Sequence, residues 1–232
     1  MNTPLATARA ASRRRLVLVL ALLLASSVVV GGITVRVLMH RNLELTNLVW
    51  NLFLAWVPFV VALTLYDRAR AGARGRTLLA LGAVWVVFLP NAPYIVTDVR
   101  VLEELVGRVE WYDVVLVVGA AALGLVLGFV SLYLVQSVVA ARLDRATGWV
   151  VAVVALGLSG LGVYLGRYER WNSWEVITEP SKIFGGLAAG LLDPLAHARP
   201  LAVSAFFAVA CVIGYAVFYA VLRLQLQRLE EH

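Results

Sequence analysis

Six long apolar runs separated by short polar segments dominate the pattern along the chain. They predict membrane spans at about 16–38, 46–66, 77–97, 114–140, 149–166 and 201–222. Each run approaches the roughly 20 residues that an α-helix needs to cross the hydrocarbon of a bilayer. The pattern therefore predicts an all-α integral membrane bundle of six transmembrane helices, with a basic segment at 1–15 and a tail at 223–232.

The third run is interrupted near its end by the stretch Pro90-Asn91-Ala92-Pro93. The two prolines remove backbone donors, so we expect the carbonyls of Val86 and Leu89 to lose their helical partners. A residue that precedes a proline is biased towards extended conformations, which applies to Leu89 and Ala92. Because broken backbone in a bilayer must be packed in protein or line a wet cavity, we predict a broken third helix near a candidate site.

Charged residues at the edges of two runs predict contacts with the membrane interface. Arg36 lies near the outer end of the first run, where we expect its side chain to snorkel towards the headgroups. Residues 99–110 place apolar and charged side chains on opposite helical faces, which predicts a short helix lying in the interface.

The charge balance supports one topology. The chain is 62% hydrophobic and only 15% charged, with a net charge of +6. With the N-terminus inside, the short inner segments carry most of the basic residues, which predicts that both termini are cytoplasmic. The net charge is then explained by topology, and we expect no binding of nucleic acid. The single cysteine excludes an intramolecular disulfide.

Polar and aromatic residues gather at the predicted outer ends of the spans. The candidate ligand-binding residues are Asn47, Asn51, Asn91, Tyr94, Asp98, Tyr112, Asp113, Arg167, Arg170, Trp171, Asn172 and Glu175. Their convergence from distant stretches favours a shared site. A purely structural interpretation stays open, since tyrosine and tryptophan are enriched at membrane interfaces and arginine pairs with nearby carboxylates.

Few residues indicate a reaction. The three histidines are far apart, without the spacing of zinc ligands: His40, His197 and His232. No charged residue lies in the middle of a span, which disfavours an ion-coupled transporter. In an enzyme, Asp98 or Asp113 would be the candidate base or would hold a divalent metal to a diphosphate, and three basic residues would hold an anion: Arg167, Arg170 and Lys182. No cofactor or protein metal site is assigned, and whether the chain is an enzyme stays open.

Small residues occur at helical spacing in two of the later spans. Gly124 and Gly128 lie four residues apart in the fourth span, as do Gly162 and Gly166 at the end of the fifth. Such pairs let neighbouring helices approach closely in membranes. We therefore expect these glycines to serve packing.

Five stretches carry a resemblance to a known family: 47–52, 88–98, 111–113, 128–132 and 166–174. Together they resemble an uncharacterised family of bacterial multi-pass membrane proteins, domain of unknown function 1361, over roughly residues 40–222. Glu175 is more often Asp in the family pattern, a change that keeps the carboxylate. The resemblance implies a bacterial inner-membrane location and implies no activity.

We therefore expect an inner-membrane protein that binds a lipid or small envelope molecule at an outer-face site. The site would be built from the second, third and fourth spans and the loop after the fifth. A membrane enzyme acting on a lipid-linked substrate is the second hypothesis, and a structural subunit that docks a membrane protein partner is the third. A channel or coupled transporter ranks last.

Overall fold

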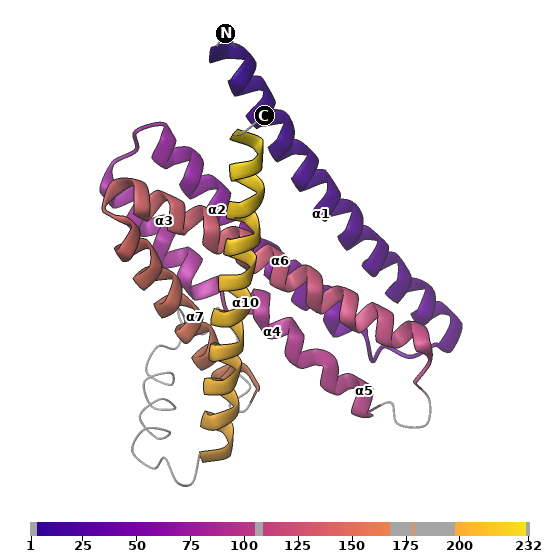
Figure 1. Cartoon of the computed structure of the whole chain (residues 1–232). Coiled ribbons are helices and arrows are strands. Elements are labelled where there is room, and N and C mark those ends of the chain that lie inside the picture. The colour runs from indigo at the N-terminus through magenta and orange to yellow at the C-terminus, as the bar shows by residue number, and fades with distance from the viewer. Residues whose placement is uncertain (1–3, 105–108, 168–177, 179–197, 231–232) are drawn as a thin grey trace.

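The computed structural model describes residues 4–104, 109–167, 178 and 198–230. Within these residues the secondary structure is helical, without strands. In chain order the elements are α1 (Pro4–His40), α2 (Thr46–Arg70), α3 (Gly75–Phe88), α4 (Asn91–Tyr94), the 3-10 helix η1 (Ile95–Arg100), α5 (Val101–Glu104), α6 (Trp111–Arg142), α7 (Arg145–Arg167) and α10 (Ala198–Glu230) (Figure 1).

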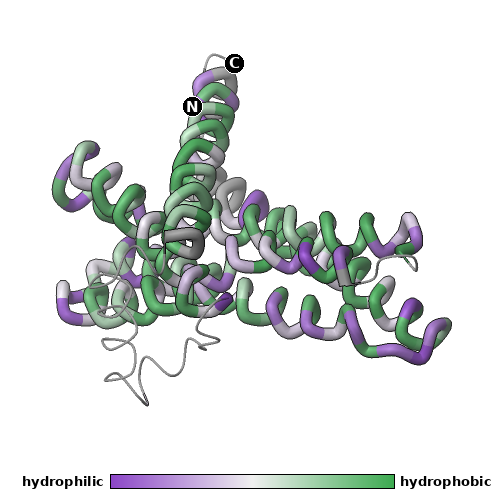
Figure 2. Tube along the Cα trace, turned by 90° about the horizontal axis from the view of Figure 1, so that it is seen from below, coloured by the Kyte–Doolittle hydropathy of each residue, from purple (hydrophilic) through white to green (hydrophobic). Residues whose placement is uncertain are grey.

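Six helical stretches are long and apolar enough to cross a membrane. Among the described residues they are Ser12–His40, Thr46–Arg70, Gly75–Glu103, Trp111–Arg142, Arg145–Arg167 and Leu201–Gln225. They confirm the predicted all-α class with six apolar helices, and they make the chain a multi-pass membrane protein. Figure 2 shows hydrophobic residues along the helices and hydrophilic residues mainly towards their ends. Where the hydrocarbon begins along each helix stays a prediction.

The apolar core consists of two clusters joined by α2 and α6, and α6 lies in the middle of the molecule (Figure 1). In one cluster α1 packs against α2, α6 and the turns after α3, for example through Ile33, Phe59 and Ile95. In the other, α3, α7 and α10 pack against the second halves of α2 and α6, for example through Trp85 and Tyr215.

Polar contacts tie the helix ends together at opposite ends of the bundle. Arg15 near the start of α1 pairs with Asp67 near the end of α2, with 2.6 Å between Nη1 and Oδ1. At the other end of α1, Arg36 pairs with Asp113 at the start of α6. α1 therefore runs antiparallel to both α2 and α6, as the predicted topology requires. Which end faces the cytoplasm stays a prediction.

The third span does not contain the extended break that its prolines predict. Leu89 has φ −52° and ψ −41°, and Pro90 has φ −56° and ψ −26°, so both are right-handed helical. Ala92 lies inside α4, and its amide donates to the carbonyl of Leu89 across 3.1 Å. The expectation of extended backbone at Leu89 and Ala92 was wrong, because tightened turns give the Leu89 carbonyl another donor.

Glycines on α6 and α7 let the proline-containing turns pack closely. A Cβ at Gly124 would lie 2.2 Å from Cγ2 of Ile95, and one at Gly162 would lie 2.5 Å from Cβ of Pro90. A Cβ at Gly128 would lie 3.0 Å from Cβ of Ala92. The predicted role of these three glycines in close packing is confirmed. Their contacts fix α4 and η1 against two helices and so fix the side chains that η1 carries.

The segment expected to form an interfacial helix is only partly described. Within 99–110, η1 continues to Arg100 and α5 covers Val101–Glu104, while residues 105–108 lie outside the described residues. Val99 is 42% exposed, and Leu102 packs against the core. The position of this segment in a membrane interface stays a prediction.

Candidate functional site

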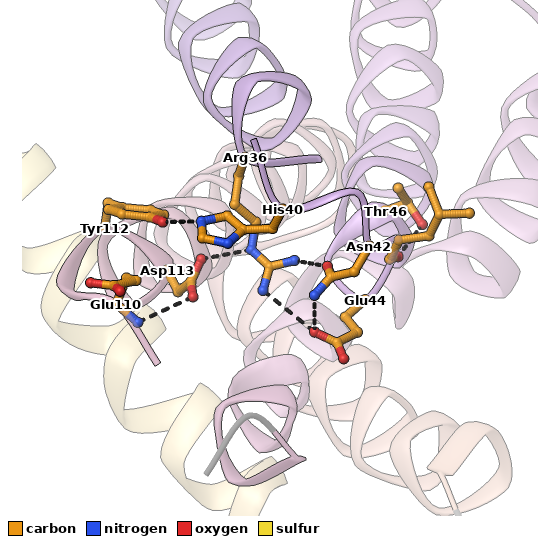
Figure 3. Close-up of polar contacts among 9 residues, drawn as sticks. Arg36, His40, Asn42, Glu44, Thr46, Glu110, Tyr112 and Asp113 are labelled. Atoms are coloured by element: carbon orange, nitrogen blue, oxygen red, sulfur yellow. Dashed lines mark hydrogen bonds and ion pairs between the residues drawn. The ribbon is translucent and has the colours of Figure 1, made fainter. Parts of the chain in front are cut away.

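The structure gathers candidate residues into two polar clusters at the same end of the bundle. The Asp98 cluster consists of Asn51, Tyr94, Thr97, Asp98 and Arg167. The Arg36 cluster consists of Arg36, His40, Asn42, Glu44, Glu110, Tyr112 and Asp113 (Figure 3). Each contains an arginine and an aspartate, but the two pairs differ in geometry.

The Asp98 cluster is formed by three segments that are distant in sequence. Asn51 of α2 donates from Nδ2 to Oδ2 of Asp98 across 2.6 Å. Arg167, the last residue of α7, donates from Nη2 to the carbonyl of Thr97 across 2.6 Å. Its Cζ lies 6.0 Å from the centroid of the Tyr94 ring. Arg167 therefore lies over the polar side of α4 and η1.

Packing on the opposite side of η1 explains this orientation. Ile95 is fully buried and meets α6 at Gly124, where there is no side chain to hold it away. Thr97 and Asp98 follow Tyr94 by three and four residues on a helical segment, so all three share a face. The Thr97 hydroxyl donates to the carbonyl of Tyr94, and the Thr97 carbonyl accepts from Arg167. The apolar contact with α6 thus turns the polar face of η1 towards α2 and α7.

The carboxylate of Asp98 is buried but incompletely bonded. Its side chain is 11% exposed, and its Oδ1 lies 3.6 Å from Nη1 of Arg167. This distance allows Coulomb attraction but is too long for a hydrogen bond. In the described part of the chain, Oδ1 therefore has no hydrogen-bond donor. The Arg167 side chain is 24% exposed, so the arginine is the accessible side of the pair.

The Arg36 pair is tighter and more deeply buried. Nε of Arg36 donates to Oδ1 of Asp113 across 2.8 Å, and the two side chains are 4% and 1% exposed. The same guanidinium donates to Oδ1 of Asn42 and lies 3.4 Å from Oε2 of Glu44. Asn42 in turn donates to Glu44 across 2.7 Å. The donors of Arg36 thus face three acceptors (Figure 3).

The start of α6 explains the position of Asp113. Asp113 is the third residue of α6, and its Oδ2 accepts from the backbone amide of Glu110 as half of a capping box. Its other oxygen is then free to accept from Arg36. Beside this pair, Tyr112 and His40 are joined by a hydrogen bond between the phenol oxygen and Nε2 (Figure 3).

The expectation that Arg36 snorkels was wrong, because Asp113 gives it a buried partner. The sequence interpretation also missed the other contributions from the end of α1 and the following loop: His40, Asn42 and Glu44. The available signal was the arginine itself. A charge within an apolar run is costly unless it has a partner, so Arg36 required an acidic partner from another helix.

The other predicted site residues are distributed as follows. Asn47 is exposed at the start of α2. Asn91 donates from Nδ2 to the carbonyl of Phe88 across 2.9 Å and so bridges α3 and α4. Four candidates after α7 lie outside the described residues, as does Lys182: Arg170, Trp171, Asn172 and Glu175. Among the described residues, no group of three or more His, Cys, Asp or Glu side chains could hold a metal ion.

Comparison with known proteins gives one match. A family model described as "Protein of unknown function (DUF1361)" matches residues 50–222. No curated protein and no solved structure matches the chain. The matched range contains every member of the Asp98 cluster, whereas it excludes Arg36, His40, Asn42 and Glu44 of the Arg36 cluster.

Proposed function

Because this chain belongs to the DUF1361 family of proteins of unknown function, we propose a function from the site: it binds a lipid or small envelope molecule at the Asp98 cluster. In this proposal the protein resides in a bacterial inner membrane with both termini in the cytoplasm. The Asp98 cluster then lies at the outer face, where envelope lipids and metabolites are accessible.

The observation that carries this proposal is the incompletely bonded Asp98–Arg167 pair. A carboxylate near the end of a membrane span is expensive to desolvate, and such residues are usually retained for function. A structural ion pair would offset that expense with close hydrogen bonds. Here the charged atoms are 3.6 Å apart and Arg167 is bonded to a backbone carbonyl instead. Among the described residues, the pair thus holds two charges in place without using their full hydrogen-bonding capacity.

Mass spectrometry of molecules that co-purify in mild detergent tests this function. We expect a defined lipid or metabolite with the wild-type protein and at least about tenfold less of it with Arg167→Gln or Asp98→Asn, a change of about 1.4 kcal/mol. The matched control is Arg15→Gln, which removes an arginine from an exposed pair at the opposite end of the bundle. Identical co-purified molecules in all four proteins, each eluting as folded protein, would contradict the proposal.

Cysteine labelling in intact cells tests the proposed orientation. Leu43→Cys lies in the α1–α2 loop near Arg36, and Arg74→Cys lies at the start of α3. The native Cys211 is buried and gives little background. We expect an impermeant thiol reagent to label Leu43→Cys and to leave Arg74→Cys unlabelled until the membrane is opened. The reverse pattern would place the Asp98 cluster on the cytoplasmic face.

A further inference from the structure

We propose that the ligand of the Asp98 cluster carries both a phosphate and a primary ammonium group, as in phosphoethanolamine. In this arrangement Arg167 binds the phosphate and Asp98 accepts hydrogen bonds from the ammonium. The inference rests on the proposed function and specifies the chemistry of its ligand.

The net charge of the cluster is the first argument. Asp98 and Arg167 carry one charge of each sign, and the other members, Asn51, Tyr94 and Thr97, are neutral. An uncompensated charge brought into a poorly hydrated site costs several kcal/mol. An anionic or cationic headgroup would leave one such charge, whereas a zwitterion keeps the site neutral. The balance of charges therefore favours a ligand with a charge of each sign.

The free capacity of Arg167 indicates the negative part of the ligand. A guanidinium has five N–H donors in a planar fork that matches two oxygens of a phosphate. In the part of the chain that the structure describes, one hydrogen bond uses this fork, from Nη2 to the Thr97 carbonyl. That bond fixes the plane of the guanidinium while the remaining donors stay available. Arg36, whose guanidinium already faces three acceptors, has no comparable capacity.

The geometry of Asp98 indicates the positive part. Asn51 holds Oδ2 across 2.6 Å, which fixes the orientation of the carboxylate. Oδ1 has no donor within hydrogen-bond distance among the described residues and lies beside the arginine rather than bonded to it. A primary ammonium has three N–H donors and could bond Oδ1, while the donors of Arg167 that the described residues leave unused bind the phosphate.

A quaternary ammonium fits less well. It has no N–H to donate, and proteins bind it instead in cages of several aromatic rings. The Asp98 cluster has one ring, Tyr94, and Arg167 already lies over it. The cluster should therefore distinguish a primary ammonium from a trimethylated one, although both carry the same charge.

Lipid titration followed by native mass spectrometry tests this inference. The probes are phosphatidylethanolamine, phosphatidylcholine and phosphatidylglycerol with identical acyl chains, added to the delipidated full chain in detergent. We expect the wild-type protein to bind phosphatidylethanolamine about tenfold more tightly than the other two. Asp98→Asn should lose the preference for phosphatidylethanolamine over phosphatidylcholine. Arg167→Gln should weaken the binding of both phosphatidylethanolamine and phosphatidylcholine, and Arg15→Gln should bind all three lipids as the wild type does.

The outcomes separate this inference from the proposed function. The inference is overturned if the wild type binds phosphatidylethanolamine and phosphatidylcholine equally, or if it binds phosphatidylglycerol more tightly. Both measurements use the wild-type protein, so neither requires a variant to fold. If a different co-purified molecule still requires Asp98 and Arg167, the proposed function stands and the inference about phosphate and ammonium fails. If no bound molecule depends on either residue, both proposals fail.

Competition with free O-phosphoethanolamine identifies the source of the headgroup. Displacement of bound phosphatidylethanolamine by millimolar free compound supports a site that recognises the headgroup alone. Persistence of the lipid under the same conditions supports a site that also requires acyl chains. Both results retain the phosphate and ammonium chemistry, provided that the wild-type preference for phosphatidylethanolamine is observed.

Discussion

The Arg36 cluster and the Asp98 cluster each place an arginine near an aspartate at the same end of the bundle, but the two pairs differ in distance and burial. Arg36 meets Asp113 at 2.8 Å, and both side chains are almost fully buried. Arg167 stays 3.6 Å from Asp98, and about a quarter of its side chain is exposed. The first pair joins α1 to α6, whereas the second lies at the end of α7, with hydrogen-bonding capacity that the described residues leave unused. This difference in the hydrogen bonds of the described residues is the reason why we propose the Asp98 cluster, and not the Arg36 cluster, as the binding site.

The two clusters also differ in where their residues come from. The residues of the Asp98 cluster lie on α2, α4, η1 and α7, all inside the range that matches the family model. Four residues of the Arg36 cluster precede this range, on α1 and the loop that follows it. The Arg36 cluster therefore attaches a segment outside the matched range to the bundle. The Asp98 cluster is internal to the matched range.

The largest expected effect is on stability, from Arg36→Met. This change leaves the Asp113 carboxylate buried without its cation, so we expect the free energy of unfolding in detergent to fall by about 3–5 kcal/mol. Retention of the ligand by the folded fraction should be unchanged. Arg15→Gln, which removes the arginine of the exposed Arg15–Asp67 pair, should lower the free energy of unfolding by about 0.2–1 kcal/mol. Equal effects at Arg36 and Arg15 would contradict the structural role of the Arg36 cluster.

A double variant sharpens this test. Arg36→Met combined with Asp113→Leu removes both buried charges, so much of the lost stability should return. Recovery should be incomplete, because Asp113 also caps α6 and the loss of a cap costs about 1 kcal/mol. If the double variant is less stable than Arg36→Met alone, desolvation of the Asp113 carboxylate does not account for the loss.

An intermediate effect is expected from Gly124→Ala. Its Cβ would lie 2.2 Å from Cγ2 of Ile95 and 2.6 Å from the carbonyl oxygen of Ala92, so η1 must shift. Overpacking of this kind costs about 1–3 kcal/mol. Because η1 carries Asp98, retention of the ligand should fall together with the free energy of unfolding.

Gly119→Ala on the same helix is the control for this variant. Its Cβ would meet Cγ2 of Val29 at 3.5 Å, an ordinary contact on the side of α6 that faces α1. Since alanine is the better helix former by about 1 kcal/mol, the control should be neutral or slightly stabilising. Undiminished ligand retention in Gly124→Ala would show that the position of η1 does not determine binding.

The smallest effect is expected from Tyr112→Phe. It removes the hydrogen bond to His40 at the exposed edge of the Arg36 cluster but keeps the ring. A single hydrogen bond of this kind contributes about 0.5–1.5 kcal/mol, and we expect a value near the lower limit because water can replace it. Thermal unfolding in detergent provides the measurement. A loss as large as that of Arg36→Met would mean that the edge of the cluster, and not the buried pair, holds α1 in place.

Part of the site could be predicted from the residues themselves. Asn51, Tyr94, Asp98 and Arg167 were candidates because their polar or aromatic side chains lie at the ends of apolar runs, and the structure brings them together. The prolines predicted a broken segment, whereas the structure has helical turns from Leu89 to Tyr94. Residue preferences before proline are weak compared with packing against Gly124 and Gly162, which holds the turns in helical form.

The pattern of apolar runs was enough to predict six apolar helices and the all-α class, because crossing a bilayer requires about 20 apolar residues in a structure that satisfies its own backbone. The sequence also pointed to Gly124, Gly128 and Gly162 as close-packing positions, but not to Gly32 and Gly160, which pack as closely. Which carboxylate each arginine meets could be learned only from the packing of the helices. Arg36 and Asp113 are 77 residues apart, and Arg167 is 70 residues from Thr97, the neighbour of Asp98, so these pairings depend on how α1, α6, α7 and η1 pack. Spacing along the chain carries no information about such distances, since contacts between helices are set by complementary surfaces.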